Sequence, residues 1–128
     1  MKIMAQVSAG ELLDKLTILE IKASRISDAG KLKSINHELD VLSQTWQSAQ
    51  PSNIDISSEI AELKKVNQSL WDIEDDIRAK ESSKQFDNEF IELARSVYIT
   101  NDRRAAIKHK LNMKLGSDIV EEKSYEQY

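Results

Sequence analysis

The 128-residue sequence contains no cysteine, which excludes disulfide bonds, a thiolate zinc site and a cysteine nucleophile. Glycine is also scarce: Gly10, Gly30 and Gly116 stand far apart, so no glycine-rich phosphate-binding loop is present. No serine has the sequence context of a nucleophile elbow. These absences argue against acyl transfer and P-loop chemistry, and the lack of cysteine leads us to expect a cytoplasmic protein.

Long apolar runs are missing as well, since no stretch approaches the roughly 20 residues that a membrane span requires. The N-terminal segment makes a poor signal peptide, because Gln6 interrupts its apolar part and charged residues follow at once. The net charge of -4 argues against bulk attraction to nucleic acid or anionic lipid. We therefore expect no membrane association, and nucleic-acid binding is not favoured.

Charge is distributed unevenly near the C-terminus. Residues 101–115 carry five basic side chains and one acidic side chain, whereas residues 116–128 carry four acidic side chains and one basic side chain. We expect the acidic tail at 116–128 to fold back on this basic stretch or on that of a partner. The length of the chain predicts a single domain, 1–128, that includes this tail.

Apolar side chains recur at alternating spacings of three and four residues, which predicts amphipathic helices. Four such segments span about 8–27, 31–49, 56–82 and 88–115. Short links join the first helix to the second and the third to the fourth, whereas Pro51 marks a longer connection between the two pairs. The sequence therefore predicts an all-α protein in which two antiparallel hairpins form an elongated, coiled-coil-like bundle.

Local signals predict where the helices begin and end. Ser8 with Glu11 three residues later predicts a capping box, and Gly30 is expected to end the first helix in a left-handed conformation. Asp87 is a predicted N-cap and Gly116 a predicted C-cap of the last helix. The polar stretch at 100–104 indicates either a break in that helix or a turn that faces something functional.

Polar side chains occupy several helix positions where an apolar seam is expected. One such stripe, on the third predicted helix, consists of Asn67, Trp71, Glu74 and Arg78. A second, on the fourth, consists of Arg95, Tyr98, Asn101 and Asp102. They indicate either a buried polar network that fixes helix register or a ligand pocket.

A buried Glu74 would need a cation, for which Arg25, Arg78 and Arg95 are candidates. The full set of ligand or network candidates is Glu11, Asp14, Asn67, Trp71, Glu74, Asp75, Arg78, Arg95, Tyr98, Asn101, Asp102, Arg103 and Lys108.

Carboxylates three residues apart offer an enzymatic alternative, because this spacing places both on one helix face where they could share Mg²⁺. An all-α, Mg²⁺-dependent nucleotide pyrophosphohydrolase would hold the metal with Glu11, Asp14, Glu74 and Asp75 and would bind phosphate with Arg78, Arg95 or Lys108. The motif order departs from the usual pattern of that class. The same carboxylates also fit ordinary surface pairs with basic residues four positions on, so no residue is assigned a catalytic role.

Four segments resemble a family of small helical proteins of unknown function from bacteria and their phages. They are GELLDKLTILEIKASRI at 10–26, NQSLWDIEDDIRAKE at 67–81, FDNEFIELARSVYITNDRRAAIKHKLN at 86–112 and GSDIVEEKSY at 116–125. The resemblance covers nearly the whole chain and implies a helical fold without an established activity. It points to the same charged positions as the periodicity, and it hints at polysaccharide assembly and glycosyl transfer.

We expect a non-enzymatic helical interaction or adaptor protein that forms a homodimer or binds a protein partner without a cofactor. The apolar stripes carry this interpretation, because they leave more apolar edge than a lone hairpin covers. The alternatives are the Mg²⁺-dependent enzyme and a non-catalytic bundle that binds a small molecule or sugar nucleotide. The first two helices are interpreted as scaffold, so a function is expected around 67–78 and 95–103.

Overall fold

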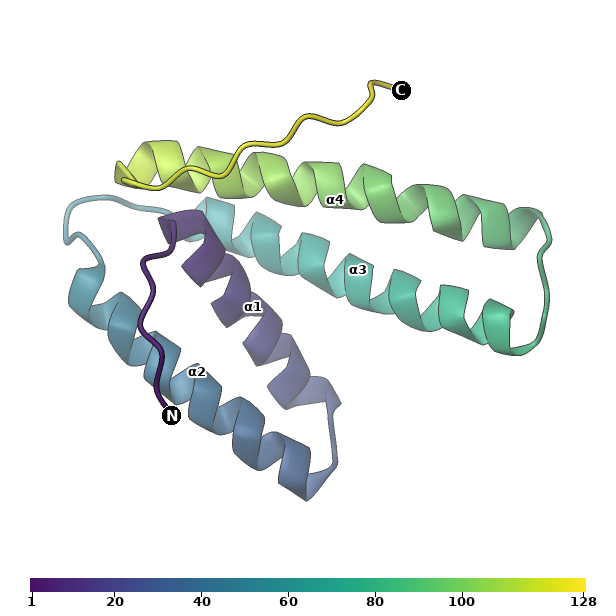
Figure 1. Ribbon diagram of the computed structural model, residues 1–128, viewed down its shortest axis with the longest axis horizontal. Helices are drawn as coiled ribbons and strands as arrows, with labels where there is room; N and C mark the ends of the chain where they lie inside the picture. Colours follow the sequence, from purple (N-terminus) through teal and green to yellow (C-terminus); the bar gives the residue numbers. More distant parts are fainter.

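The computed structural model describes residues 1–128 and consists of four α-helices without a strand. Helix α1 spans Ala9–Arg25, α2 spans Ala29–Ala49, α3 spans Ser57–Ser82 and α4 spans Asn88–Leu115. Figure 1 shows that α1 and α2 form one antiparallel hairpin and that α3 and α4 form another. The predicted all-α class and its two hairpins are confirmed, and each predicted helix end lies within two residues of the observed one.

Side-chain caps begin three of the four helices. Ser8 Oγ accepts a hydrogen bond from the backbone N–H of Glu11 at 3.0 Å, and Asp28 and Asp87 cap α2 and α4 in the same way. The side chain of Glu11 turns instead toward Lys108 of α4. The reciprocal half of the predicted capping box is therefore not formed.

The prediction that Gly30 ends the first helix is wrong. Helix α1 ends at Arg25, Ile26 follows with an extended backbone, and Asp28 caps α2, so Gly30 lies in the first turn of the second helix. Aspartate is a strong N-cap, and it starts the new helix before the glycine is reached. Gly116 does end α4 in the left-handed conformation, with φ of 62°.

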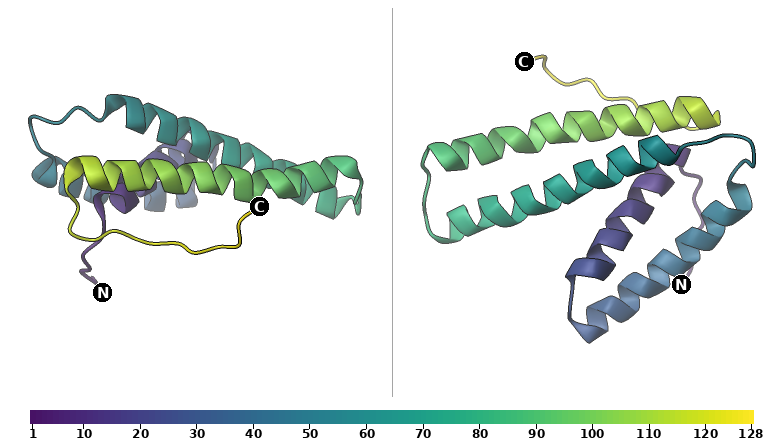
Figure 2. Two further views of the ribbon diagram at one scale, coloured as in Figure 1. Left: turned by 90° about the horizontal axis from the view of Figure 1, so that it is seen from above. Right: turned by 180° about the vertical axis from the view of Figure 1, so that it is seen from behind.

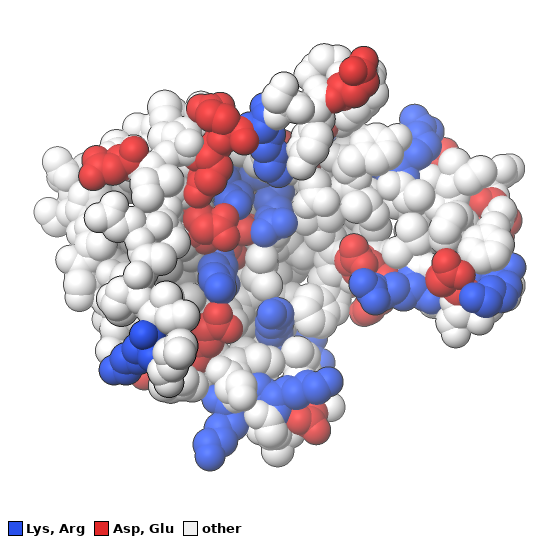
Figure 3. All heavy atoms as spheres, in the orientation of Figure 1, with Lys and Arg blue, Asp and Glu red and all other residues white.

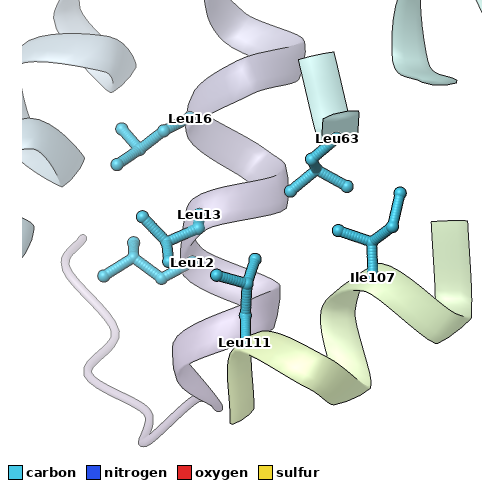
Figure 4. Packing of buried hydrophobic residues seen from close by; sticks show 6 residues of the cluster. All are labelled: Leu12, Leu13, Leu16, Leu63, Ile107 and Leu111. Carbon is cyan, nitrogen blue, oxygen red and sulfur yellow. The ribbon is translucent and has the colours of Figure 1, made fainter. Parts of the chain in front are cut away.

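Helix α1 lies at the centre of the molecule, because it packs against α2, α3 and α4, whereas α2 packs on α1 alone. The apolar core joins the three inner helices and consists of Leu12, Leu13, Leu16, Leu63, Ile107 and Leu111. Figure 4 shows these side chains gathered around α1. Leu39, Leu42 and Trp46 of α2 pack on this cluster from outside.

The two hairpins diverge from this shared base, as Figure 1 and the right view of Figure 2 show. The buried residues of α3 lie between Glu59 and Asn67 and those of α4 between Thr100 and Asn112, and no residue between 68 and 99 is buried. We call residues 68–99 the distal arm. None of the four helices combines the length and the apolar character that crossing a membrane would require.

Candidate functional site

A buried aspartate on α1 joins three helices through its carboxylate. Asp14 is 1% exposed, and its Oδ1 accepts hydrogen bonds from Asn67 Nδ2 of α3 and Arg104 Nε of α4, each at 2.9 Å. Arg104 also donates from its Nη2 to Asp14 Oδ2, so the contact is bidentate. An unpaired carboxylate in this position would be strongly destabilising, and the arginine explains why the aspartate is tolerated.

The remaining polar atoms around Asp14 also have partners. Asn67 Nδ2 donates to Thr17 Oγ1 at 2.9 Å, and the Thr17 hydroxyl donates to the backbone carbonyl of Asp14 at 2.7 Å. No buried side-chain nitrogen or oxygen in the structure lacks a hydrogen-bond partner. This arrangement fits a polar network that fixes how α1, α3 and α4 pack against one another.

Further ion pairs surround the network. Lys108 Nζ lies 2.6 Å from Glu11 Oε2 and 3.8 Å from Asp14 Oδ2, and Lys114 Nζ lies 2.7 Å from Glu59 Oε1. The hydrogen bond from Lys114 holds the pKa of Glu59 below its ordinary value. Figure 3 shows the wider pattern as a band of alternating acidic and basic side chains across the middle of this face. Most of the charge on this face is therefore locally compensated.

A close approach of α1 to α4 brings the site together. Asn112 of α4 is 1% exposed, and its Oδ1 accepts a hydrogen bond from the backbone N–H of Gly10 at 2.6 Å. A Cβ added at Gly10 would lie 2.5 Å from the carbonyl oxygen of Lys108. Only glycine therefore allows the first turn of α1 to pack this closely on α4.

The C-terminal tail, residues 116–128, folds back along α4 of its own chain (Figures 1 and 2), which is one of the two predicted arrangements. Glu121 accepts hydrogen bonds from Ser8 Oγ at 2.5 Å and from Asn112 Nδ2 at 3.3 Å. Burial alone would raise the pKa of Glu121, but the hydrogen bonds and the nearby Lys108 outweigh it, so the pKa is lowered.

Aromatic contacts fix the end of the tail. The Tyr128 hydroxyl donates to Asp102 Oδ2 at 2.6 Å, and the rings of Tyr98 and Tyr128 meet edge to face with centroids 5.3 Å apart. The hydrogen bond to the Asp102 carboxylate raises the pKa of Tyr128.

A polar cavity of about 260 Å³ lies between α4 and the tail. Its main polar lining consists of Asn101, Arg104, Lys108, His109, Asn112 and Glu121. Basic side chains and amide groups therefore line the α4 side of this cavity, while the tail contributes Glu121, Glu122 and Lys123.

The structure brings only some of the predicted candidates together. Glu11, Asp14, Asn67 and Lys108 meet where α1, α3 and α4 join. Tyr98, Asn101 and Asp102 lie beside the tail. The others lie apart: Trp71 is near Arg25, Glu74 pairs with Arg78, Arg95 pairs with Glu92, Asp75 is exposed, and Arg103 lines a separate groove.

The expectation that Glu74 occupies a seam is wrong. Its side chain is exposed and pairs with Arg78 at 3.0 Å, as the surface-pair interpretation proposed. Helix α1 ends close by, where the Arg25 guanidinium lies 6.0 Å from the Trp71 ring centre. No third helix covers α3 beyond that point, so Glu74 meets solvent.

The carboxylates of the Mg²⁺ alternative do not converge. Glu11 and Asp14 face basic partners on α4, whereas Glu74 and Asp75 are exposed on the distal arm. No group of three or more His, Cys, Asp or Glu side chains lies close enough together to hold a metal ion.

Sequence reasoning missed several residues of the site: Ser8, Thr17, Arg104, Asn112 and Glu121. A signal for Arg104 was present, because it falls on the core-facing stripe, four residues after Thr100, three before Ile107 and seven before Leu111. Helix α1, which the sequence led us to interpret as scaffold, contributes Asp14 and Thr17 to the centre of the network.

The chain matches, over residues 1–128, the model of the "Family of unknown function (DUF6165)". It therefore belongs to this family, in agreement with the resemblance to a family of unknown function in its sequence. Comparisons with the curated proteins and with the solved structures gave no match.

Proposed function

We propose that this protein is a helical interaction module that forms a homodimer through its distal arm. One observation carries the proposal: no residue of the arm is buried, although apolar side chains follow both of its helices. Leu70, Ile77, Leu93 and Val97 remain half-buried where the two helices meet. Because helices gain most of their stability from tertiary packing, a two-helix arm without a covering layer favours a partner.

The arm also exposes large apolar groups. Phe86, Ile91 and Tyr98 are 57%, 51% and 44% exposed. Ile91 and Tyr98 are seven residues apart, so they lie on the same side of α4. A second hairpin packed on this arm would form a four-helix bundle and remove this surface from water.

Charge favours a second copy of the chain as the partner. The distal arm carries eight acidic and four basic side chains, whereas residues 100–115 carry one acidic and five basic side chains. Arg104, Lys108 and Lys114 already pair with Asp14, Glu11 and Glu59, so Arg103 and Lys110 are the basic side chains of this half that remain for a partner. A twofold axis between two antiparallel hairpins would place the acidic arm of each copy beside the basic half of the other. A parallel arrangement would instead bring like charges together.

The size of the distal arm indicates how much of the hairpin a dimer would use. The arm contains residues 88–99 of α4, about 18 Å of helix, and two adjacent helices are about 20 Å wide. Its footprint is on the order of 360 Å² for each copy, so an interface of the standard size, about 800 Å² per partner, would extend from the arm onto the adjoining half of the hairpin.

Light scattering and sedimentation at tens of micromolar test the proposal. The full chain is expected to be a dimer, and Ile91→Lys to be a monomer of unchanged helix content because the side chain is exposed. Val41→Lys is the matched control, since Val41 is 46% exposed on α2. High salt should weaken the dimer by screening the complementary charges. A monomeric wild-type chain, or equal effects of the two substitutions, would overturn the proposal.

A further inference from the structure

The C-terminal tail is held in place by few contacts. Beyond Ser117, none of its residues makes a backbone–backbone hydrogen bond. Its inner anchor is the carboxylate of Glu121, and its outer anchor is Tyr128. The tail is therefore attached mainly through side chains, and losing the inner anchor would release it over the cavity.

The groups that hold the Glu121 carboxylate are buried and oriented in advance. Ser8 is 0% exposed and Asn112 is 1% exposed. Ser8 Oγ already accepts a hydrogen bond from the N–H of Glu11, and Asn112 Oδ1 already accepts one from Gly10, so the free hydroxyl and amide donors of both side chains face Glu121. Fixed donors of this kind would serve any anion placed there.

Basic side chains extend this site into the adjoining cavity. Arg104 uses Nε and Nη2 to hold Asp14, and its Nη1 has no partner within the protein. The Lys108 side chain is 19% exposed and lines the same cavity. The cavity of about 260 Å³ is much larger than the roughly 30 Å³ that one water molecule occupies in the liquid, so it has room for a phosphate group.

We propose that Ser8, Asn112 and Lys108 form a binding site for a phosphate group, and that Glu121 occupies this site as an internal competitor. A carboxylate has two oxygens, which meet Ser8 and Asn112. A phosphate group has further oxygens for the ammonium of Lys108, which lies one helical turn before Asn112 and whose charge already acts on Glu121. Arg104 lies about 12 Å before Asn112 along the helix axis and adds positive charge to the cavity. The lowered pKa of Glu121 supports the preference of this site for an anion.

Calorimetric titration of the full chain with inorganic phosphate tests the proposal. Glu121→Ala removes the competitor, and we expect it to bind phosphate at least about tenfold more tightly than the wild type (about 1.4 kcal/mol). Glu126→Ala is the matched control, because it removes the same charge from the tail without removing an anchor. It should bind phosphate as the wild type does.

Three further measurements test where the site lies and which anion it binds. Adding Lys108→Gln to the Glu121→Ala variant should return the phosphate affinity to the wild-type level. Backbone amide resonances of Gly10 and Asn112 should shift on phosphate addition to the Glu121→Ala variant, whereas those of the distal arm should not. Acetate should bind more weakly than phosphate. Equal phosphate affinities of the Glu121→Ala and Glu126→Ala variants would overturn the proposal, as would equally tight binding of acetate.

Discussion

Replacing Arg104 by methionine should destabilise the protein more than replacing Arg104 and Asp14 together. Methionine keeps much of the apolar stem that packs between α1 and α4, but it removes both hydrogen bonds to the buried carboxylate. Asp14, which is 1% exposed, then retains Asn67 as its close donor and Lys108 at 3.8 Å. The substitution thus leaves a buried charge without its main counter-charge.

Breaking a buried ion pair on one side typically costs about 3–5 kcal/mol. Lys108 can move toward Asp14, so the lower end, about 3 kcal/mol, is expected for Arg104→Met. The double variant Asp14→Leu/Arg104→Met removes both charges, and Asn67 keeps its bond to Thr17. Apolar replacement of a buried pair is often near neutral, so we expect the double variant to lose about 1 kcal/mol or less.

Urea denaturation followed by circular dichroism measures these differences, at one fixed protein concentration because association would add to the stability. With a slope of about 2 kcal/mol per molar urea, a loss of about 3 kcal/mol lowers the midpoint by about 1.5 M. A loss below about 1 kcal/mol for Arg104→Met, or additive losses in the double variant, would show that the pair is not the main stabilising contact of Asp14.

Three further substitutions, two of them followed as a function of pH, test other contacts of the structure. Gly10→Ala should destabilise the protein by about 1–2 kcal/mol in urea denaturation, because overpacking against the Lys108 carbonyl at 2.5 Å outweighs the helix propensity gained from alanine; a stabilised variant would contradict this. Since the pKa of Glu121 is lowered in the folded state, its contribution is complete above the ordinary value of 4.5 and is lost as the pH falls through the folded value. The difference in urea midpoint between the wild type and Glu121→Gln should therefore be constant at neutral pH and shrink below pH 4.5. A difference that stays constant below pH 4.5 would contradict this prediction. The difference in urea midpoint between the wild type and Glu59→Gln should shrink in acid in the same way, because the hydrogen bond from Lys114 lowers the pKa of Glu59.

The helices could be predicted because their signals are local. The N-cap Asp87 and the C-cap Gly116 act on backbone groups within a few residues, so the bounds of α4 agree with the prediction. Gly30 shows the limit of such signals: Asp28 lies two residues earlier and caps α2, so the glycine falls inside the second helix instead of ending the first.

The site could be predicted only in part, because its partners lie far apart in the sequence. Asp14 and Arg104 are 90 positions apart, and periodicity cannot tell which helix faces which. The pattern that marked Asn67 as a seam residue marked Glu74 as well, although only Asn67 is covered by α1. The point at which a seam ends depends on the length and direction of the covering helix. The apolar pattern of one helix gives no information on either.

The unequal lengths of the helices connect the polar network to the exposed arm. Helix α1 has 17 residues and α4 has 28 residues, or about 26 Å against about 42 Å. Even if the axis of α1 were aligned with that of α4, about 16 Å of the α3–α4 hairpin would remain uncovered. The contacts of Asp14 and Gly10 anchor α1 on the basic half of α4, so the uncovered length falls on the acidic distal arm. The same contacts that stabilise the junction therefore determine which half of the hairpin is left free for a partner.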